Sequence, residues 1–227
     1  ATGTVTVPAG NTLTIEPGVD VLCDSAVSFV VNGTLLAVGT PQDSIRFLKS
    51  GESSWGGMTF DGSSNLLAFV RVSGGDKGGG DGGGIWAFSG VTEIRNSVIS
   101  GNRAANGGGV AGWSTTLRMT DCTISGNEAG AKGGGVYGTV KMLRCTISDN
   151  SAYQGGGVAF TAAGWQWWAA LFRVIRHGRV VDYGAIVATL GVTPCRDVLC
   201  RTTPRYGEPP CSTNWLGFLT PPVFRSP

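Results

Sequence analysis

The sequence predicts an all-β solenoid, and the strongest observation behind this prediction is a short pattern that occurs three times. Its copies read SVISGN, CTISGN and CTISDN, and they occupy Ser97–Asn102, Cys122–Asn127 and Cys145–Asn150. Three glycines and a valine follow each copy after a short polar spacer, at Gly107–Val110, Gly133–Val136 and Gly155–Val158. Repeats of this length that are rich in glycine and β-branched residues are typical of stacked solenoids.

A second observation, the alternation of apolar and polar residues, predicts three strands in each coil. Leu117 and Met119 alternate with polar residues, and after a slip of one residue Cys122 begins a new alternation. Short period-two runs predict strands, and the slip at Thr120–Asp121 predicts a sharp corner between two of them. The triple-glycine segment leads into the third strand through backbone angles that glycine tolerates. Each repeat is therefore predicted to form one coil of a parallel β-helix, about 4.8 Å from the next.

Stacking in register places equivalent residues in columns. One column should be apolar and buried, and another should be an asparagine ladder whose side-chain amides hydrogen-bond along the stack. The apolar column consists of Ile99, Ile124 and Ile147, and the ladder consists of Asn102, Asn127 and Asn150. At a different corner, Asp121 and Arg144 should form an exposed ion pair, which adds little stability.

Two cysteines of the repeats, Cys122 and Cys145, occupy the same inward position in successive coils. We expect them to be buried, adjacent and reduced, as small apolar side chains in a column that Ser97 begins. In-register parallel strands rarely offer the side-chain geometry that a disulfide needs.

The segments before the repeats carry related patterns, at Thr4–Gly18, Val31–Thr40 and Trp55–Phe60. Together with the repeats, they resemble right-handed parallel β-helix proteins, which include the polymorphic outer membrane protein repeats and the pectate-lyase-like superfamily. The resemblance covers about residues 1–160 and implies a right-handed coil in a bacterial exported or cell-surface protein. Similar repeats serve adhesins, autotransporter passengers and polysaccharide-cleaving enzymes, so the resemblance leaves the function open.

Three regions are expected: irregular coils over residues 1–80, regular coils over 81–160, and an atypical tail over 161–227. The tail is rich in arginine, proline and tryptophan, and the repeat stops there. In one interpretation, Trp165–Ile175 is an amphipathic helix whose residues Trp165, Trp168, Phe172 and Ile175 cap the open end of the stack. In the other, which we prefer, the tail is read out of frame or disordered. We assign no function to it.

No zinc site is expected in the tail. Cys195, Cys200 and Cys211 lack a fourth ligand, and His177, the only histidine, lies upstream of them. No apolar stretch is long enough for a membrane span, and no basic patch predicts a nucleic-acid partner.

Two features are candidate sites. Gly74–Gly84 reads GGDKGGGDGGG, in which Asp76 and Asp81 are candidate calcium ligands, although a long flexible corner is the simpler interpretation. Trp86 and Tyr137 each follow the first inward residue of a strand, so we expect them to be exposed. Aromatic rings at such positions suit carbohydrate or protein contact, although incidental exposure is the simpler interpretation.

The repeated positions are structural rather than catalytic. Acidic residues do not recur at the coil period, and no serine–histidine–acid set occurs in the repeats, so we predict no catalytic residues and no cofactor beyond the candidate calcium. The sequence therefore predicts a non-catalytic exported or cell-surface solenoid, an adhesin-like or envelope module. The alternative is a carbohydrate-active enzyme, a polysaccharide lyase or glycoside hydrolase, whose site is not evident.

Overall fold

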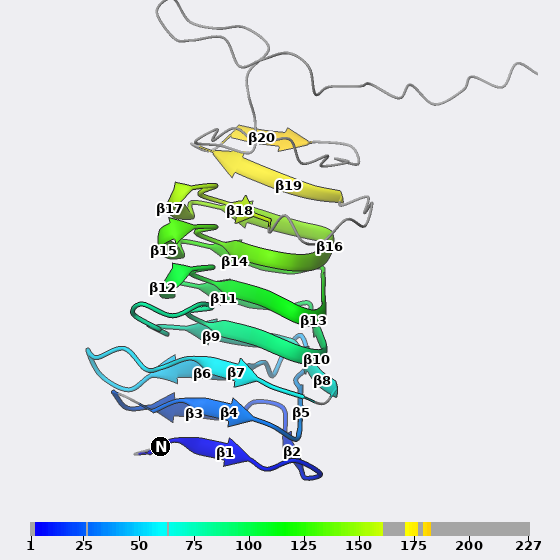
Figure 1. Ribbon diagram of the computed structural model, residues 1–227. Coiled ribbons are helices and arrows are strands. Elements are labelled where there is room, and N and C mark those ends of the chain that lie inside the picture. The colour runs from blue at the N-terminus through cyan, green and yellow to red at the C-terminus, as the bar shows by residue number, and fades with distance from the viewer. Residues whose placement is uncertain (1–2, 26, 63, 161–170, 177–178, 183–227) are drawn as a thin grey trace, which may run out of the picture.

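The computed structural model describes residues 3–25, 27–62, 64–160, 171–176 and 179–182. In these residues the chain forms strands joined by turns, wound into a parallel β-solenoid of about six turns (Figure 1). The predicted fold class is confirmed. Over the same residues, no helix is long and apolar enough to cross a membrane.

Each coil contributes to three faces, and neighbouring strands on a face are parallel and in register. The first face contains β1 (Val5–Val7), β4 (Phe29–Val31), β7 (Met58–Phe60), the starts of β10 (Ile85–Arg95), β13 (Val110–Thr120) and β16 (Val136–Ser148), and β18 (Val158–Ala159). The second face contains β2 (Thr12–Ile15), β5 (Thr34–Val38), β8 (Ser64–Ala68) and the later parts of β10, β13 and β16. The third face contains β3 (Asp20–Cys23), β6 (Ile45–Lys49), β9 (Val70–Ser73), β11 (Val98–Ser100), β14 (Thr123–Ser125) and the end of β16.

The regular coils carry a short extra strand that the alternation did not predict. These strands form a separate small sheet of β12 (Arg103–Asn106), β15 (Glu128–Lys132) and β17 (Ser151–Gln154). They connect the asparagine corner to the triple-glycine corner of each coil.

The described part of the tail is strand, which corrects the helical interpretation of Phe172 and Ile175. The strand β19 (Leu171–Arg176) pairs in parallel with β16 and so extends the third face by one strand. The strand β20 (Arg179–Asp182) pairs antiparallel with β19, so the last strand among the described residues departs from the parallel order of the stack. Trp165 and Trp168, and the three cysteines and the histidine of the tail, lie outside the described residues.

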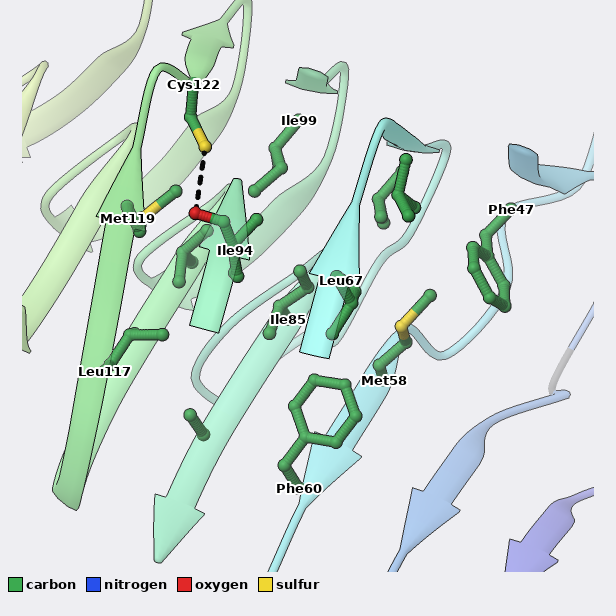
Figure 2. Packing of buried hydrophobic residues seen from close by; sticks show 14 of the residues in the cluster. Phe47, Met58, Phe60, Leu67, Ile85, Ile94, Ile99, Leu117, Met119 and Cys122 are labelled. Atoms are coloured by element: carbon green, nitrogen blue, oxygen red, sulfur yellow. Dashed lines mark hydrogen bonds between the residues drawn. The ribbon is translucent and has the colours of Figure 1, made fainter. Parts of the chain in front are cut away.

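The core consists of inward side chains from all three faces, which meet along the axis of the solenoid (Figure 2). Ile99, Ile124 and Ile147 lie in register on the third face, and each is at most 1% exposed. The predicted isoleucine column is therefore confirmed. Phe47, on the same face in an earlier coil, packs edge-on against Phe29 of the first face.

One column of the first face narrows between the coil of Phe60 and the coil of Gly138. After Val7 and Val31, its inward residues, in register from coil to coil, are Phe60, Ala87, Gly112 and Gly138. A Cβ atom added to Gly112 would lie 3.2 Å from Leu117 Cδ2 and 3.3 Å from Val140 Cγ2. Side chains of the second face therefore fill the space that a larger first-face residue would need.

The predicted asparagine ladder is also confirmed. Asn102 donates two hydrogen bonds to Asn127 Oδ1, one from its backbone N–H and one from Nδ2, both 3.0 Å long. Asn127 donates to Asn150 Oδ1 in the same way, at 2.9 Å. Glycines of the triple-glycine corner pack directly against the ladder. A Cβ atom on Gly109 would lie 3.0 Å from Asn127 Nδ2, and one on Gly108 would lie 2.3 Å from the backbone oxygen of Glu128. The recurrence of glycine beside asparagine is thus a consequence of close packing.

The corner between the second and third faces needs a left-handed residue in each coil. Asp121 and Arg144 occupy it with φ of 54° and 52°. Arg144 donates to both carboxylate oxygens of Asp121, from Nε at 2.6 Å and from Nη2 at 2.5 Å. The predicted ion pair is confirmed, and these hydrogen bonds lower the pKa of Asp121.

The cysteine column begins directly after this corner. Cys122 and Cys145 are reduced and 1% exposed, as predicted. Both thiols also form hydrogen bonds, which the prediction of small apolar side chains did not include. Cys122 Sγ donates to the carbonyl oxygen of Thr120 at 3.3 Å, as Ser97 Oγ does to the residue two before it. The hydrogen bond with Cys145, followed by burial, raises the pKa of the Cys122 thiol.

Candidate functional site

The two aromatic residues singled out from the sequence lie on the outer side of the first face, in one ladder. Trp86 of β10 is in register with Ala111 of β13, and Ala111 is in register with Tyr137 of β16. The two rings are therefore separated by one coil, whose residue at this position, Ala111, is only 2% exposed. Both are half-buried, which corrects the expectation that they are exposed.

Two further aromatic side chains lie two residues further along the same strands. Phe88 is 39% exposed and Trp113 is 49% exposed. The register of Ala87 with Gly112 places Phe88 level with Trp113 in adjacent coils. Sequence reasoning missed this pair, although continued alternation past Trp86 would have indicated both outward positions. We call Trp86, Phe88, Trp113 and Tyr137 the aromatic face.

Part of the aromatic face is in contact with a lysine from the glycine-rich segment. Lys77 Nζ lies 5.9 Å from the centroid of the Trp86 ring, within the range of a cation–π interaction. Lys77 Nζ also donates a hydrogen bond of 2.7 Å to Thr59 Oγ1, which belongs to the coil before Trp86. Burial lowers the pKa of Lys77. The Trp86 ring also packs against Phe88, with ring centroids 5.4 Å apart.

The glycine-rich segment, Gly74–Gly84, is tied to the next coil rather than being a free corner. Asp76 forms a parallel bridge with Arg103, and Asp81 forms one with Asn106. The Gly78 N–H donates to Asp76 Oδ1 at 2.8 Å, which closes a local turn. Asn106 Nδ2 donates to Asp81 Oδ1 at 2.8 Å. The segment therefore occupies the place that the short extra strands occupy in later coils.

Both predicted calcium ligands thus accept hydrogen bonds from neighbouring amides. Among the residues that the structure describes, no group of three or more histidine, cysteine, aspartate or glutamate side chains gathers in a way that would hold a metal ion. Binding of calcium by Asp76 and Asp81 stays a prediction.

Besides accepting the hydrogen bond from Asn106, Asp81 interacts electrostatically with Tyr137 of the aromatic face. Partial burial raises the pKa of Tyr137, and the negative charge of Asp81 raises it further. The Asp81 carboxylate and the Tyr137 hydroxyl therefore lie within electrostatic reach of each other, on either side of the coil that contains Ala111 and Asn106. The aromatic residues and the glycine-rich segment, predicted as separate features, form one site.

The described residues thus form a parallel β-solenoid that carries a ladder of outward aromatic side chains on its first face. Comparison with protein families matches residues 45–168 to the right-handed β-helix region, which is more than half of the 227 residues. The chain belongs to this family. Comparison with curated proteins and with solved structures gives no match.

Proposed function

We propose that this protein is a non-catalytic β-helix that binds carbohydrate through its aromatic face. The observation that carries the proposal is the gathering of four aromatic side chains on three adjacent strands, with Phe88 and Trp113 exposed. Aromatic rings contribute large apolar contact areas, and Tyr137 and Trp113 also present polar atoms to a ligand rich in hydroxyl groups. The rigid stack holds these rings in place before a ligand binds, so little ordering entropy opposes binding.

A location at the bacterial cell surface, or outside the cell, is part of the proposal. It is supported by the resemblance of residues 1–160 to exported β-helix proteins. The role would be adhesin-like or that of an envelope module, in which a long rigid body presents its binding face to a polysaccharide.

Binding to oligosaccharides, measured by calorimetry, tests the proposed function. Trp113→Ala and Trp86→Ala should each weaken binding at least several-fold, because stacked aromatic contacts supply most of the contact energy. Tyr153→Ala is the matched control, because Tyr153 is 74% exposed and lies on β17 in the separate small sheet. Equal weakening by the control, or no effect of the two tryptophan variants, would contradict the proposal.

A carbohydrate-active enzyme is the second candidate function, and Lys77 is the observation that favours it. A partly buried amine with a lowered pKa is a suitable proton acceptor beside a bound sugar. Incubation with polygalacturonate and related glycans, with and without calcium, distinguishes the candidates. Release of reducing or unsaturated ends that Lys77→Met abolishes would establish the enzyme, and binding without such release would support the binding module.

A further inference from the structure

The accessible part of the aromatic face lies at the corner between the first and second faces of the solenoid. Phe88 and Trp113 at this corner are 39% and 49% exposed, whereas Trp86 and Tyr137 are half-buried. Ala111, in register between the latter two, is only 2% exposed, so the protein itself covers that position. A ligand therefore reaches the aromatic face mainly at Phe88 and Trp113.

The corner that carries Trp113 projects beyond the coil that follows it. Its four residues, Trp113–Thr116, lie opposite the single residue Thr139 of the next coil. The corner of the preceding coil, which carries Phe88, has the same length as that of Trp113. Phe88 and Trp113 therefore lie side by side, while the next coil has no corner of equal length to cover Trp113. The step leaves an apolar surface accessible to the ring of a sugar.

A carboxylate lies beside Phe88 in the coil before it. Asp61 directly follows Phe60, whose register partner in the next coil is Ala87. It is therefore level with Phe88, and it is exposed. Its Oδ1 accepts a hydrogen bond of 2.8 Å from Ser89 Oγ, which holds the carboxylate at this corner. Because an ionised carboxylate has about four acceptor sites, Asp61 can also accept hydrogen bonds from the hydroxyl groups of a sugar.

The charges at this corner suit a neutral ligand better than an acidic one. The outward column consists of Asp61, Phe88, Trp113 and Thr139. Neither these residues nor those directly before and after them in the sequence include a lysine or an arginine. Lys77 Nζ is engaged with Trp86 and Thr59. An acidic sugar would therefore meet one like charge in this column and no opposite charge to compensate for it.

We propose that the aromatic face binds a glycan of neutral hexopyranoses, whose rings pack against Phe88 and Trp113 and whose hydroxyl groups donate hydrogen bonds to Asp61. This inference rests on the proposed function, because it names the class of glycan that the same aromatic face takes. The aromatic rings contact the C–H groups of the sugar, and charge-assisted hydrogen bonds to the carboxylate orient its hydroxyl groups. Asp61 is thus the residue that selects against uronic acids.

Two matched pairs of hexasaccharides test the inference by calorimetry on the wild-type protein. One pair is the β-1,4-linked hexamer of glucose and that of glucuronic acid. The other is the fully methyl-esterified α-1,4-linked hexamer of galacturonic acid and its free acid. Within a pair the linkage is the same and the charge differs, so the neutral member should bind at least about threefold more tightly, as repulsion by one exposed charge would produce. The preference should shrink as salt is added, because Asp61 is exposed.

Asp61→Asn keeps an acceptor for Ser89 and removes the charge. It should weaken binding of the neutral hexamers by about threefold to tenfold, because a charge-assisted hydrogen bond is replaced by a neutral one. It should also bring the two members of each pair to within about twofold of each other. Asp43→Asn is the matched control, because Asp43 is an exposed acid between β5 and β6, away from the aromatic face, and it should leave both values unchanged.

The outcomes separate this inference from the proposed function. An acidic hexamer that binds the wild-type protein as tightly as its neutral partner would overturn the inference and leave the proposed function intact. Binding of none of the four hexamers would overturn both. An Asp61→Asn variant that keeps the wild-type preference would also overturn the inference, because the selectivity would then come from elsewhere.

Discussion

Asn127 binds Asn102 and Asn150 at the same time, and each of its amide atoms is used. Its Oδ1 accepts from the backbone N–H and from Nδ2 of Asn102, and its Nδ2 donates to Asn150 Oδ1 and to the carbonyl oxygen of Ile99. The side chain is 1% exposed. The asparagine ladder is thus a continuous network, buried at Asn102 and Asn127 and half-buried at Asn150, in which every residue uses both the donor and the acceptor of a neutral amide.

Asn127→Asp should destabilise the protein by about 3 kcal/mol or more, because a carboxylate would face two oxygen atoms in a buried position. Urea unfolding followed by circular dichroism gives the free energy of unfolding. Asn96→Asp is the matched control, since Asn96 is exposed and has the left-handed φ of 49° that both residues tolerate. Equal losses in the two variants would show that the ladder is not the cause.

Ile124→Ala should cost about 2–5 kcal/mol, because the cavity would open between Ile99 and Ile147 in the layers on either side. Ser125→Ala, one residue later and outward on the same strand, should change the free energy of unfolding by less than about 0.5 kcal/mol. A small effect of Ile124→Ala would mean that the stack closes around the cavity.

Gly138→Ala should prevent β13 and β16 from pairing normally. A Cβ atom at Gly138 would lie 1.9 Å from the backbone oxygen of Gly112, and the φ of 96° is unfavourable for alanine. Gly130→Ala is the control, because nothing lies within 4 Å of a Cβ there and φ is not in the left-handed region; it should be neutral or stabilise slightly. Soluble yield and the thermal midpoint report both effects, and equal midpoints would refute the steric argument.

Cys122→Ser should be tolerated better than Cys122→Val. Serine reproduces the hydrogen bond that Ser97 makes, whereas valine removes it, at a cost of about 0.5–1.5 kcal/mol, because the Thr120 carbonyl oxygen keeps only its hydrogen bond from the Asn96 N–H. The raised pKa of the Cys122 thiol means that its stability contribution is present below its ordinary value of 9.0 and declines as pH rises above it. The free energy of unfolding should therefore decline as pH rises above 9.0, and the decline should be smaller in Cys122→Ser. An unchanged decline would exclude the thiol as its source.

Arg144→Gln should raise the pKa of Asp121, because Arg144 supplies both hydrogen bonds that lower it. A carboxyl group with a lowered pKa contributes stability above its unfolded value, and that contribution is lost as pH falls through its folded value. Carbon NMR titration of the Asp121 carboxyl group gives its pKa in the folded wild-type protein and in the folded variant. An identical titration in the variant would show that the ion pair does not form in solution.

The repeated columns were predictable because each position had three copies to compare. Ile124 and Asn127 had a counterpart in the coil on either side, so alternation and spacing determined their environment. The aromatic face was predicted only in part. The equivalent positions of Trp86 and Tyr137 in their repeats were recognised. Phe88 and Trp113 were missed, because predicting them requires the alternation to be continued beyond the segment in which the repeats match.

Lys77 could not be predicted from the repeats, because the segment that contains it has no second copy. Its position depends on bridges from Asp76 and Asp81 to the following coil, and on a hydrogen bond to Thr59 in the coil before. These are contacts between coils, which spacing within one coil does not report. The burial of Trp86 beneath Lys77 was missed for the same reason.

The first-face column that narrows from Phe60 to Gly138 affects where the solenoid can gain a coil by duplication. A duplicated coil inserted beside Gly112 or Gly138 would set glycine against glycine, and the asparagine ladder would continue through it. A duplicate of the coil with Phe60 would place a second benzyl group directly beside the first, so the core around this column would have to repack. We therefore expect repeats to be gained and lost more readily beside the coils of Gly112 and Gly138 than beside the coil of Phe60.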